Sequence, residues 1–256
     1  MPYEYNSPNA LVAIVVPIWK PTLTASEHMN VEVTFRSNPG VQRYFMAPIG
    51  MDLSYYRESF SGTGFYEIPD NHLQTVESYS AFMLTPGLYE HFSFVDFVAI
   101  CQTDAFLVQD ISSPLSAVDW DYVGAPWTTP MKLNRWSVTV PTALTPLLRK
   151  APFKAQLHVG NGGLSIRRTS TFARALADLG WPGFGEEINE DVAISYLGHR
   201  KVITVATRDE AQSWFFERGP AVPPTTDVRG YHALEKYYPS EYGALIQLLR
   251  SKHFNA

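Results

Sequence analysis

A short apolar run that ends in a polar trio is the feature that most constrains the fold of this chain. Residues 95–101 are mostly apolar and include β-branched side chains, which is typical of a strand buried on both faces of a sheet. Gln102, Thr103 and Asp104 follow directly, before a second apolar run at residues 105–108. Open α/β sheets bind ligands at the carboxyl ends of their strands, so Asp104 is a candidate site residue. The alternative is that Asp104 only forms a turn, because Asp is a common turn residue.

The residues before this strand alternate between strand patterns and helix patterns. Expected strands cover residues 11–16, 41–48 and 65–68, and expected helices cover residues 24–37, closed by residues 38–40, and residues 70–83, with a break at Pro86 and Gly87. This order implies a predominantly parallel sheet flanked by helices, as in Rossmann-like folds. No internal repeat or low-complexity linker divides the chain, so we expect residues 1–256 to form a single α/β domain.

The middle of the chain carries a stretch without clear periodicity. Residues 128–157 contain scattered basic residues and four prolines, which predicts an irregular insertion. Its basic side chains could meet phosphate, although solvated surface charge explains each of them equally well; they are Arg135, Arg149, Lys150 and Lys154. Further along, residues 201–206 are expected to form a strand and residues 240–251 an amphipathic closing helix.

Composition excludes several classes of protein. Of the 256 residues 45% are hydrophobic and 18% are charged, which describes a globular chain with a substantial core. A formal charge of −5 without a long basic run argues against non-specific nucleic-acid binding. The single cysteine, Cys101, lies in the apolar strand and indicates a buried thiol in a reducing compartment. Residues 1–10 lack a secretion signal and residues 10–18 are too short an apolar run to span a bilayer, so we expect a cytoplasmic protein, with peripheral membrane association left open.

Two later motifs supply further candidates. The sequence GNGG at residues 160–163 permits backbone angles that side chains forbid, and lets the chain approach a ligand closely, which makes Asn161, Gly162 and Gly163 candidates. The alternative is a tight bend that enters a strand. At residues 189–191 the sequence NED starts a short helix, with Asn189 as N-cap and both acids in its first turn. The alternative is that those acids serve only the helix N-terminus, an arrangement that lowers a carboxyl pKa unless burial raises it again.

The motifs QTDAFLV, YVGAPW, VGNGGLSIRR and NEDV together resemble those of GT-A-fold nucleotide-sugar glycosyltransferases. They are more closely similar to an uncharacterised bacterial family that is found among sugar-polymer genes and held to be GT-A-like. The resemblance covers residues 94–195, with a weaker extension to residue 232. It departs from the GT-A pattern at Gln102, where the first Asp of an Asp-x-Asp motif would stand.

This resemblance implies a role for each candidate. Asp191 would be the general base and Glu190 would orient the acceptor. Asp104 and a late histidine, His232, would hold a divalent metal, Mn²⁺ or Mg²⁺, at the donor diphosphate. The remaining donor- and substrate-binding residues would be Pro17, beside Ile18 and Trp19 after the first strand, together with Gln102, Thr103, Trp127, Asn161, Gly162 and Gly163.

The expected activity is then transfer of a sugar from a nucleotide-sugar donor to the hydroxyl of a glycan, glycolipid or other acceptor, with inversion, in bacterial surface-polysaccharide or glycoconjugate synthesis. Two alternatives stay open, because fold resemblance alone does not fix function. One is a nucleotidyltransferase built on a similar sheet, and the other is a non-catalytic module that binds a sugar nucleotide.

Overall fold

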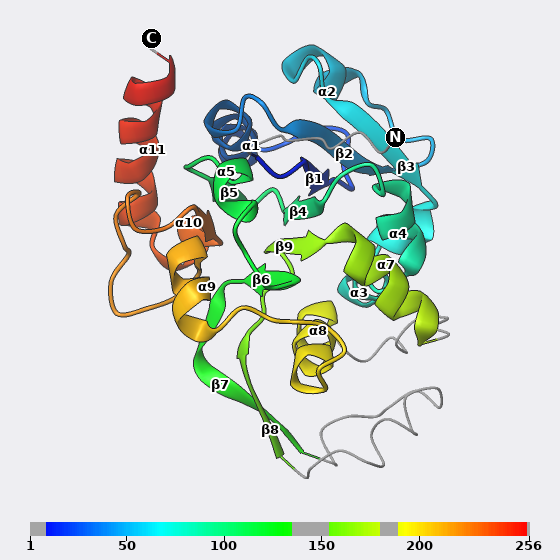
Figure 1. The fold of residues 1–256 in the computed structure, drawn as a ribbon. Helices are drawn as coiled ribbons and strands as arrows, with labels where there is room; N and C mark the ends of the chain where they lie inside the picture. The colour runs from blue at the N-terminus through cyan, green and yellow to red at the C-terminus, as the bar shows by residue number, and fades with distance from the viewer. Residues whose placement is uncertain (1–8, 135–153, 180–188, 255–256) are drawn as a thin grey trace.

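The computed structural model describes residues 9–134, 154–179 and 189–254, and a six-stranded sheet lies at its centre (Figure 1). In sheet order the strands are β3 (Gly64–Ile68), β2 (Gln42–Pro48), β1 (Val12–Pro17), β4 (Phe97–Cys101), β9 (Leu164–Arg168) and β6 (Tyr122–Gly124). The first four run parallel, whereas β9 is antiparallel to both β4 and β6. Every residue of β1 and β4 is buried. The predominantly parallel α/β fold expected from the sequence is therefore confirmed.

Helices flank this sheet on both sides in Figure 1. The longer or site-forming ones are α1 (Ala25–Ser37), α3 (Val76–Met83), α4 (Pro86–His91), α7 (Thr169–Asp178), α8 (Glu190–His199), α9 (Arg208–Trp214) and α11 (Pro239–Phe254). Shorter ones are α2 (Ser54–Ser59), η1 (Asp70–Leu73), α5 (Ser112–Leu115) and α10 (Leu234–Tyr237). Thr24 caps α1 through a reciprocal pair of hydrogen bonds with Glu27, which fixes the start of that helix next to the end of β1. Among the described helices none is long and apolar enough to span a bilayer.

A small second sheet brings the late histidine to the polar trio. Its strands are β10 (Phe215–Phe216), β11 (Gly230–His232) and β5 (Ala105–Leu107). Strand β5 begins directly after Asp104, and it pairs antiparallel with β11 so that His232 lies opposite Ala105. The Ala233 N–H also donates to the Asp104 carbonyl oxygen over 3.0 Å. Strand pairing, and not proximity in sequence, therefore places His232 beside Asp104.

The segment expected to be an irregular insertion is partly regular. Strands β7 (Pro126–Asn134) and β8 (Lys154–Val159) form a two-stranded antiparallel ribbon, which extends below the main sheet in Figure 1. The backbone register shifts between Pro126 and Met131, and this irregularity conceals the strand pattern in the sequence. Arg135, Arg149 and Lys150 lie outside the described residues, as do three of the four prolines of this segment, Pro141, Pro146 and Pro152.

Two other expectations are wrong. The helix expected over residues 70–83 is divided, because Thr75 adopts an extended conformation and caps a new helix through Ser78. Residues 201–206 form no strand and contribute one isolated bridge, between Val205 and Tyr122. The break expected at Pro86 and Gly87 is present: α3 ends at Met83, and Pro86 opens α4, since proline is accepted in the first helical turn, where its missing N–H is not needed.

Candidate active site

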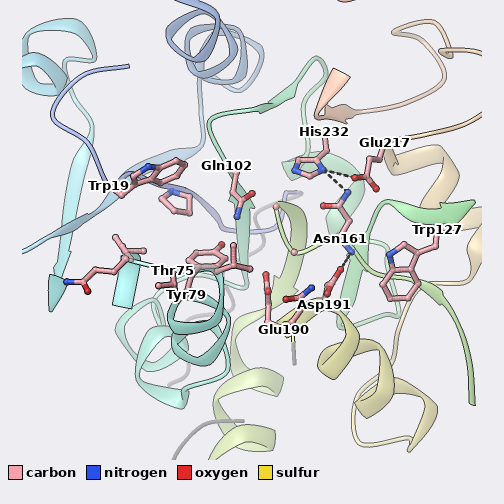
Figure 2. Close-up of a pocket in the computed structure, with 17 residues that line it drawn as sticks. Trp19, Thr75, Tyr79, Gln102, Trp127, Asn161, Glu190, Asp191, Glu217 and His232 are labelled. Carbon is pink, nitrogen blue, oxygen red and sulfur yellow. Dashed lines mark hydrogen bonds and ion pairs between the residues drawn. The ribbon is translucent and has the colours of Figure 1, made fainter. Parts of the chain in front are cut away.

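A cavity of about 470 Å³ opens at the carboxyl ends of β1 and β4 (Figure 2). Its wall is built from segments far apart in the sequence, which the sheet brings to one edge. Ten of the residues predicted from the sequence line it: Pro17, Trp19, Gln102, Trp127, Asn161, Gly162, Gly163, Glu190, Asp191 and His232. The other described lining residues are Leu73, Gln74, Thr75, Val76, Tyr79, Asn189 and Glu217.

Three predicted residues lie outside this lining. Ile18 is buried in the core. Thr103 is buried beneath the lining, where its hydroxyl donates to Glu27 Oε1 over 3.0 Å and its carbonyl oxygen accepts from Asn30. Asp104 lies on the outer side of His232, and its side chain is 56% exposed. Thr103 thus anchors the end of β4 to α1, and Asp104 meets the cavity only through His232.

The glycines of the GNGG segment are required by their neighbours. A Cβ on Gly162 would lie 1.7 Å from Glu190 Oε1, and a Cβ on Gly163 would lie 2.5 Å from His232 Nε2 and 2.6 Å from Gln102 Oε1. Asn161 has a φ of 67°, in the left-handed region that few side chains tolerate. The segment therefore passes close to the Glu190, His232 and Gln102 side chains, and it also forms the tight bend into β9.

Asp191 points at the backbone of this segment. Its Oδ2 accepts from the Asn161 N–H over 3.0 Å, and its Oδ1 accepts from the Val192 N–H over 2.7 Å. Burial and the adjacent Glu190 carboxylate raise the pKa of Asp191 to about 6, although both hydrogen bonds and the charge of Arg167 act in the opposite direction. Helix capping alone would lower this pKa, so burial decides the sign.

Glu190 has side-chain partners, unlike the backbone partners of its neighbour. It is 5% exposed, and its Oε2 accepts from the Ser80 hydroxyl over 2.8 Å. Its Oε1 lies 3.7 Å from Nη2 of Arg167, a fully buried guanidinium that also donates to Tyr89 and Ser165. Figure 2 shows Glu190 and Asp191 side by side at the lower edge of the cavity. The site thus contains two adjacent carboxylates with different surroundings.

His232 lies between two carboxylates on the other side of the cavity. Its Nε2 is 3.4 Å from Asp104 Oδ1, and its Nδ1 is 3.5 Å from Glu217 Oε1 and 2.9 Å from the Asn161 side-chain nitrogen. Burial lowers the pKa of His232, but the two carboxylates outweigh it and raise the pKa to about 9. His232 is therefore a positive charge in a cavity whose other charged lining residues, among those described, are all carboxylates.

The residues around His232 suit a divalent cation in the chemistry of their donor atoms. Nε2 is buried and makes no hydrogen bond to a described residue, and it shares the space above Gly163 with Gln102 Oε1. Imidazole nitrogen, carboxylate oxygen and amide oxygen are all accepted ligands of Mn²⁺ and Mg²⁺. Within residues 9–134, 154–179 and 189–254 no three His, Cys, Asp or Glu side chains gather as a metal cluster, so the remaining ligands would come from Gln102 and from substrate.

Sequence reasoning missed three residues that shape this site. Tyr79 on α3 lines the cavity. Glu217 follows β10 and carried no motif. Arg167 stands next to Arg168 in the sequence, and its position on β9 between two strands shows that it is buried.

Comparisons with known proteins agree with the fold. A crystal structure of an active-site mutant of LgtC matches with a TM-score of 0.50 at 10% identity, over 94% of this chain and 95% of that one. A crystal structure of the galactosyltransferase LgtC in complex with donor and acceptor sugar analogs has a TM-score of 0.48 at 10% identity, over 92% and 95%. The first of these matches confirms the GT-A-like fold expected from the sequence. At this identity the likeness concerns the fold alone.

No curated protein matches the chain. A family described as "Protein of unknown function (DUF5672)" matches residues 63–231, which include β4, the GNGG segment, α8 and most of β11. This match covers more than half of the sequence, and the chain therefore belongs to the DUF5672 family.

Proposed function

We propose that this protein is an inverting glycosyltransferase that moves a sugar from a nucleotide-sugar donor to a hydroxyl acceptor. The observation that carries the proposal is the Asp191 carboxyl, which lines a cavity at the ligand-binding edge of the sheet and has a pKa of about 6. A general base works best when its pKa lies near the operating pH, because it is then ionised and still basic enough to accept a proton. The GT-A-like fold supports the same class of reaction by analogy.

The proposed reaction uses Asp191 on the acceptor side. Its carboxylate takes the proton of the acceptor hydroxyl while that oxygen attacks the anomeric carbon of the donor. The bond between the anomeric carbon and the diphosphate oxygen breaks on the opposite face, and the nucleoside diphosphate leaves with the electron pair. The Asn161 N–H, bonded to Oδ2, orients the carboxylate toward the cavity and next to the sugar-binding backbone of Gly162 and Gly163.

The donor side is proposed to lie between the end of β1 and His232. Pro17 and the half-exposed ring of Trp19 offer an apolar surface for the nucleotide, and Gln102 stands at the end of β4. A divalent cation held by Asp104 and His232, with Gln102, would supply positive charge to the departing diphosphate. His232 itself is cationic in the free protein, and it would release a proton on binding the metal, because only the neutral imidazole has a free nitrogen lone pair. Because no described lining residue is Lys or Arg, the diphosphate depends on this corner for charge compensation.

The biological setting belongs to the same proposal. The acceptor would be a glycan or glycolipid of a bacterial surface polysaccharide or glycoconjugate, and transfer would occur in the cytoplasm, at the membrane when the acceptor is lipid-linked. The apolar part of the lining, Leu73, Val76 and Trp127, is compatible with a sugar ring or the start of a lipid chain.

A screen of nucleotide sugars tests the proposal. Thermal shift with and without Mn²⁺ or Mg²⁺ identifies the donor, because a ligand of the folded state raises the melting temperature. The product released with that donor then decides between the candidates: nucleoside diphosphate supports glycosyl transfer, and pyrophosphate would instead indicate nucleotidyl transfer. Binding with neither product, across a panel of acceptors, would leave a non-catalytic binding module.

A further inference from the structure

A buried ion pair below the cavity floor has no place in the reaction described above. Arg167 on β9 is 0% exposed, and removing a guanidinium from water is expensive unless partners compensate it. Two of its nitrogens are satisfied, by the Tyr89 hydroxyl at 2.9 Å and the Ser165 hydroxyl at 3.2 Å. The third, Nη2, makes no hydrogen bond to a described residue and faces Glu190 Oε1 across 3.7 Å.

Glu190 connects Arg167 to the GNGG segment and to the first turn of α8. Ser80 on α3 holds its Oε2, and its Oε1 lies against Gly162, where even a methyl group would not fit. The next residue on α8 is Asp191, whose carboxylate is bonded to the backbone of Asn161. One side chain therefore joins α3, β9 and the GNGG segment to the first turn of α8.

We propose that Arg167 is a positioning residue: it holds Glu190, and Glu190 holds the first turn of α8 so that Asp191 stays against the Asn161 N–H at the cavity edge. Glu190 then acts as a support for the base and not as a ligand of the acceptor. This inference rests on the proposed function, since it assigns Asp191 the role of base. The dependence of the Asp191 carboxyl pKa on Arg167 can be measured without any substrate.

Charge makes the proposal distinguishable from a purely structural role. Groups of both signs face the Asp191 carboxyl from every element packed against it: Glu190 on α8, Arg167 on β9, Tyr122 on β6, and the N–H groups of Asn161 and Val192. Removing the Arg167 charge leaves Glu190 uncompensated and should raise the pKa of Asp191. Removing the Glu190 charge should lower the pKa of Asp191. A loss of packing alone would not shift this pKa in opposite directions in the two variants.

The test is a carboxyl ¹³C NMR titration of Asp191, assigned by its absence from Asp191→Asn, in Arg167→Met, Glu190→Gln and the double variant. We expect shifts on the order of 1 unit, upward in Arg167→Met and downward in Glu190→Gln, with the neutral double variant between them. Arg168→Met is the matched control. It removes the next arginine of the same strand, which has its own carboxylate partner in Asp121 at 3.1 Å, and should leave the titration unchanged.

Should Arg167→Met fail to fold because it leaves a buried carboxylate without its charge partner, Arg167→Lys and Glu190→Gln keep the proposal testable. Lysine retains the charge and should restore the titration in part. With an active donor, the acid limb of the kcat/KM profile should move in the same directions as the NMR titration. An Asp191 titration unaffected in Glu190→Gln, or moved equally by Arg168→Met, would overturn the proposal. Shifts of the expected signs in a protein that turns over no nucleotide sugar would support the positioning network and reject the glycosyltransferase.

Discussion

Replacing Asp191 by Asn should stabilise the folded protein at neutral pH while it removes activity. The pKa of about 6 stands against an ordinary value of 3.8, a difference of 6 − 3.8 = 2.2 units. A raised folded pKa means that the contribution of this group to stability is fully present below pH 3.8 and is lost as the pH rises through 6. At 1.36 kcal/mol per unit, ionising Asp191 costs the fold up to about 3 kcal/mol at pH 7.5. Asparagine avoids that cost.

The substitution also loses an interaction. An amide has one oxygen, so it can accept from Asn161 or from Val192 but not from both, and the lost hydrogen bond costs about 1 kcal/mol. The expected net change is a stabilisation of about 1–2 kcal/mol at pH 7.5, or roughly 2–8 °C in melting temperature. At pH 4 the wild-type carboxyl is protonated, and the variant should be less stable by about 1 kcal/mol.

Urea denaturation of wild type and Asp191→Asn at both pH values measures the crossover, and turnover with a donor should fall by about 10²–10⁴-fold with donor affinity retained. Asp110→Asn is the matched control, because burial raises the pKa of Asp110 but its hydrogen bonds to Ser112 and Ser113 outweigh burial and lower it. That variant should lose stability above pH 4, the opposite sign. A destabilised Asp191→Asn at pH 7.5 would show that the carboxylate is a cap, and near-normal turnover would remove it from the mechanism.

Further predictions concern the donor side. Asp104→Ala should lose most of the affinity for nucleoside diphosphate while keeping its melting temperature, and unchanged affinity by calorimetry would reject the assignment. His232→Ala should weaken the dependence on Mn²⁺, which a chelator titration of activity measures. Gly163→Ala places a methyl group 2.5–2.6 Å from His232 and Gln102, so donor affinity should fall with the fold intact by circular dichroism. Trp19→Ala should weaken binding of the nucleotide by roughly 10-fold, as measured by calorimetry, if its half-exposed ring contacts the base.

Much of the cavity wall could be located from the sequence because its parts are local signals. A buried strand followed by polar residues, a glycine-rich turn and an acidic helix start are each visible within about ten residues, and all three lie at one sheet edge. Contacts between distant segments could not be predicted in the same way. Glu217 approaches His232 only because β10 pairs with β11, and Arg167 is buried only because β9 lies between β4 and β6.

At the start of α8, the surroundings of an acidic residue determine its pKa more than its position in the helix does. A helix N-terminus stabilises a carboxylate by about 0.3–1 kcal/mol, which would lower the pKa of either acid. For Asp191, burial and the neighbouring Glu190 act against this and prevail, since the net change is upward. Glu190 has a hydroxyl and a guanidinium as partners, whereas Asp191 has only two backbone N–H groups. Adjacent acids in such different environments are suited to different tasks, and the raised pKa of Asp191 suits it to take a proton near neutral pH.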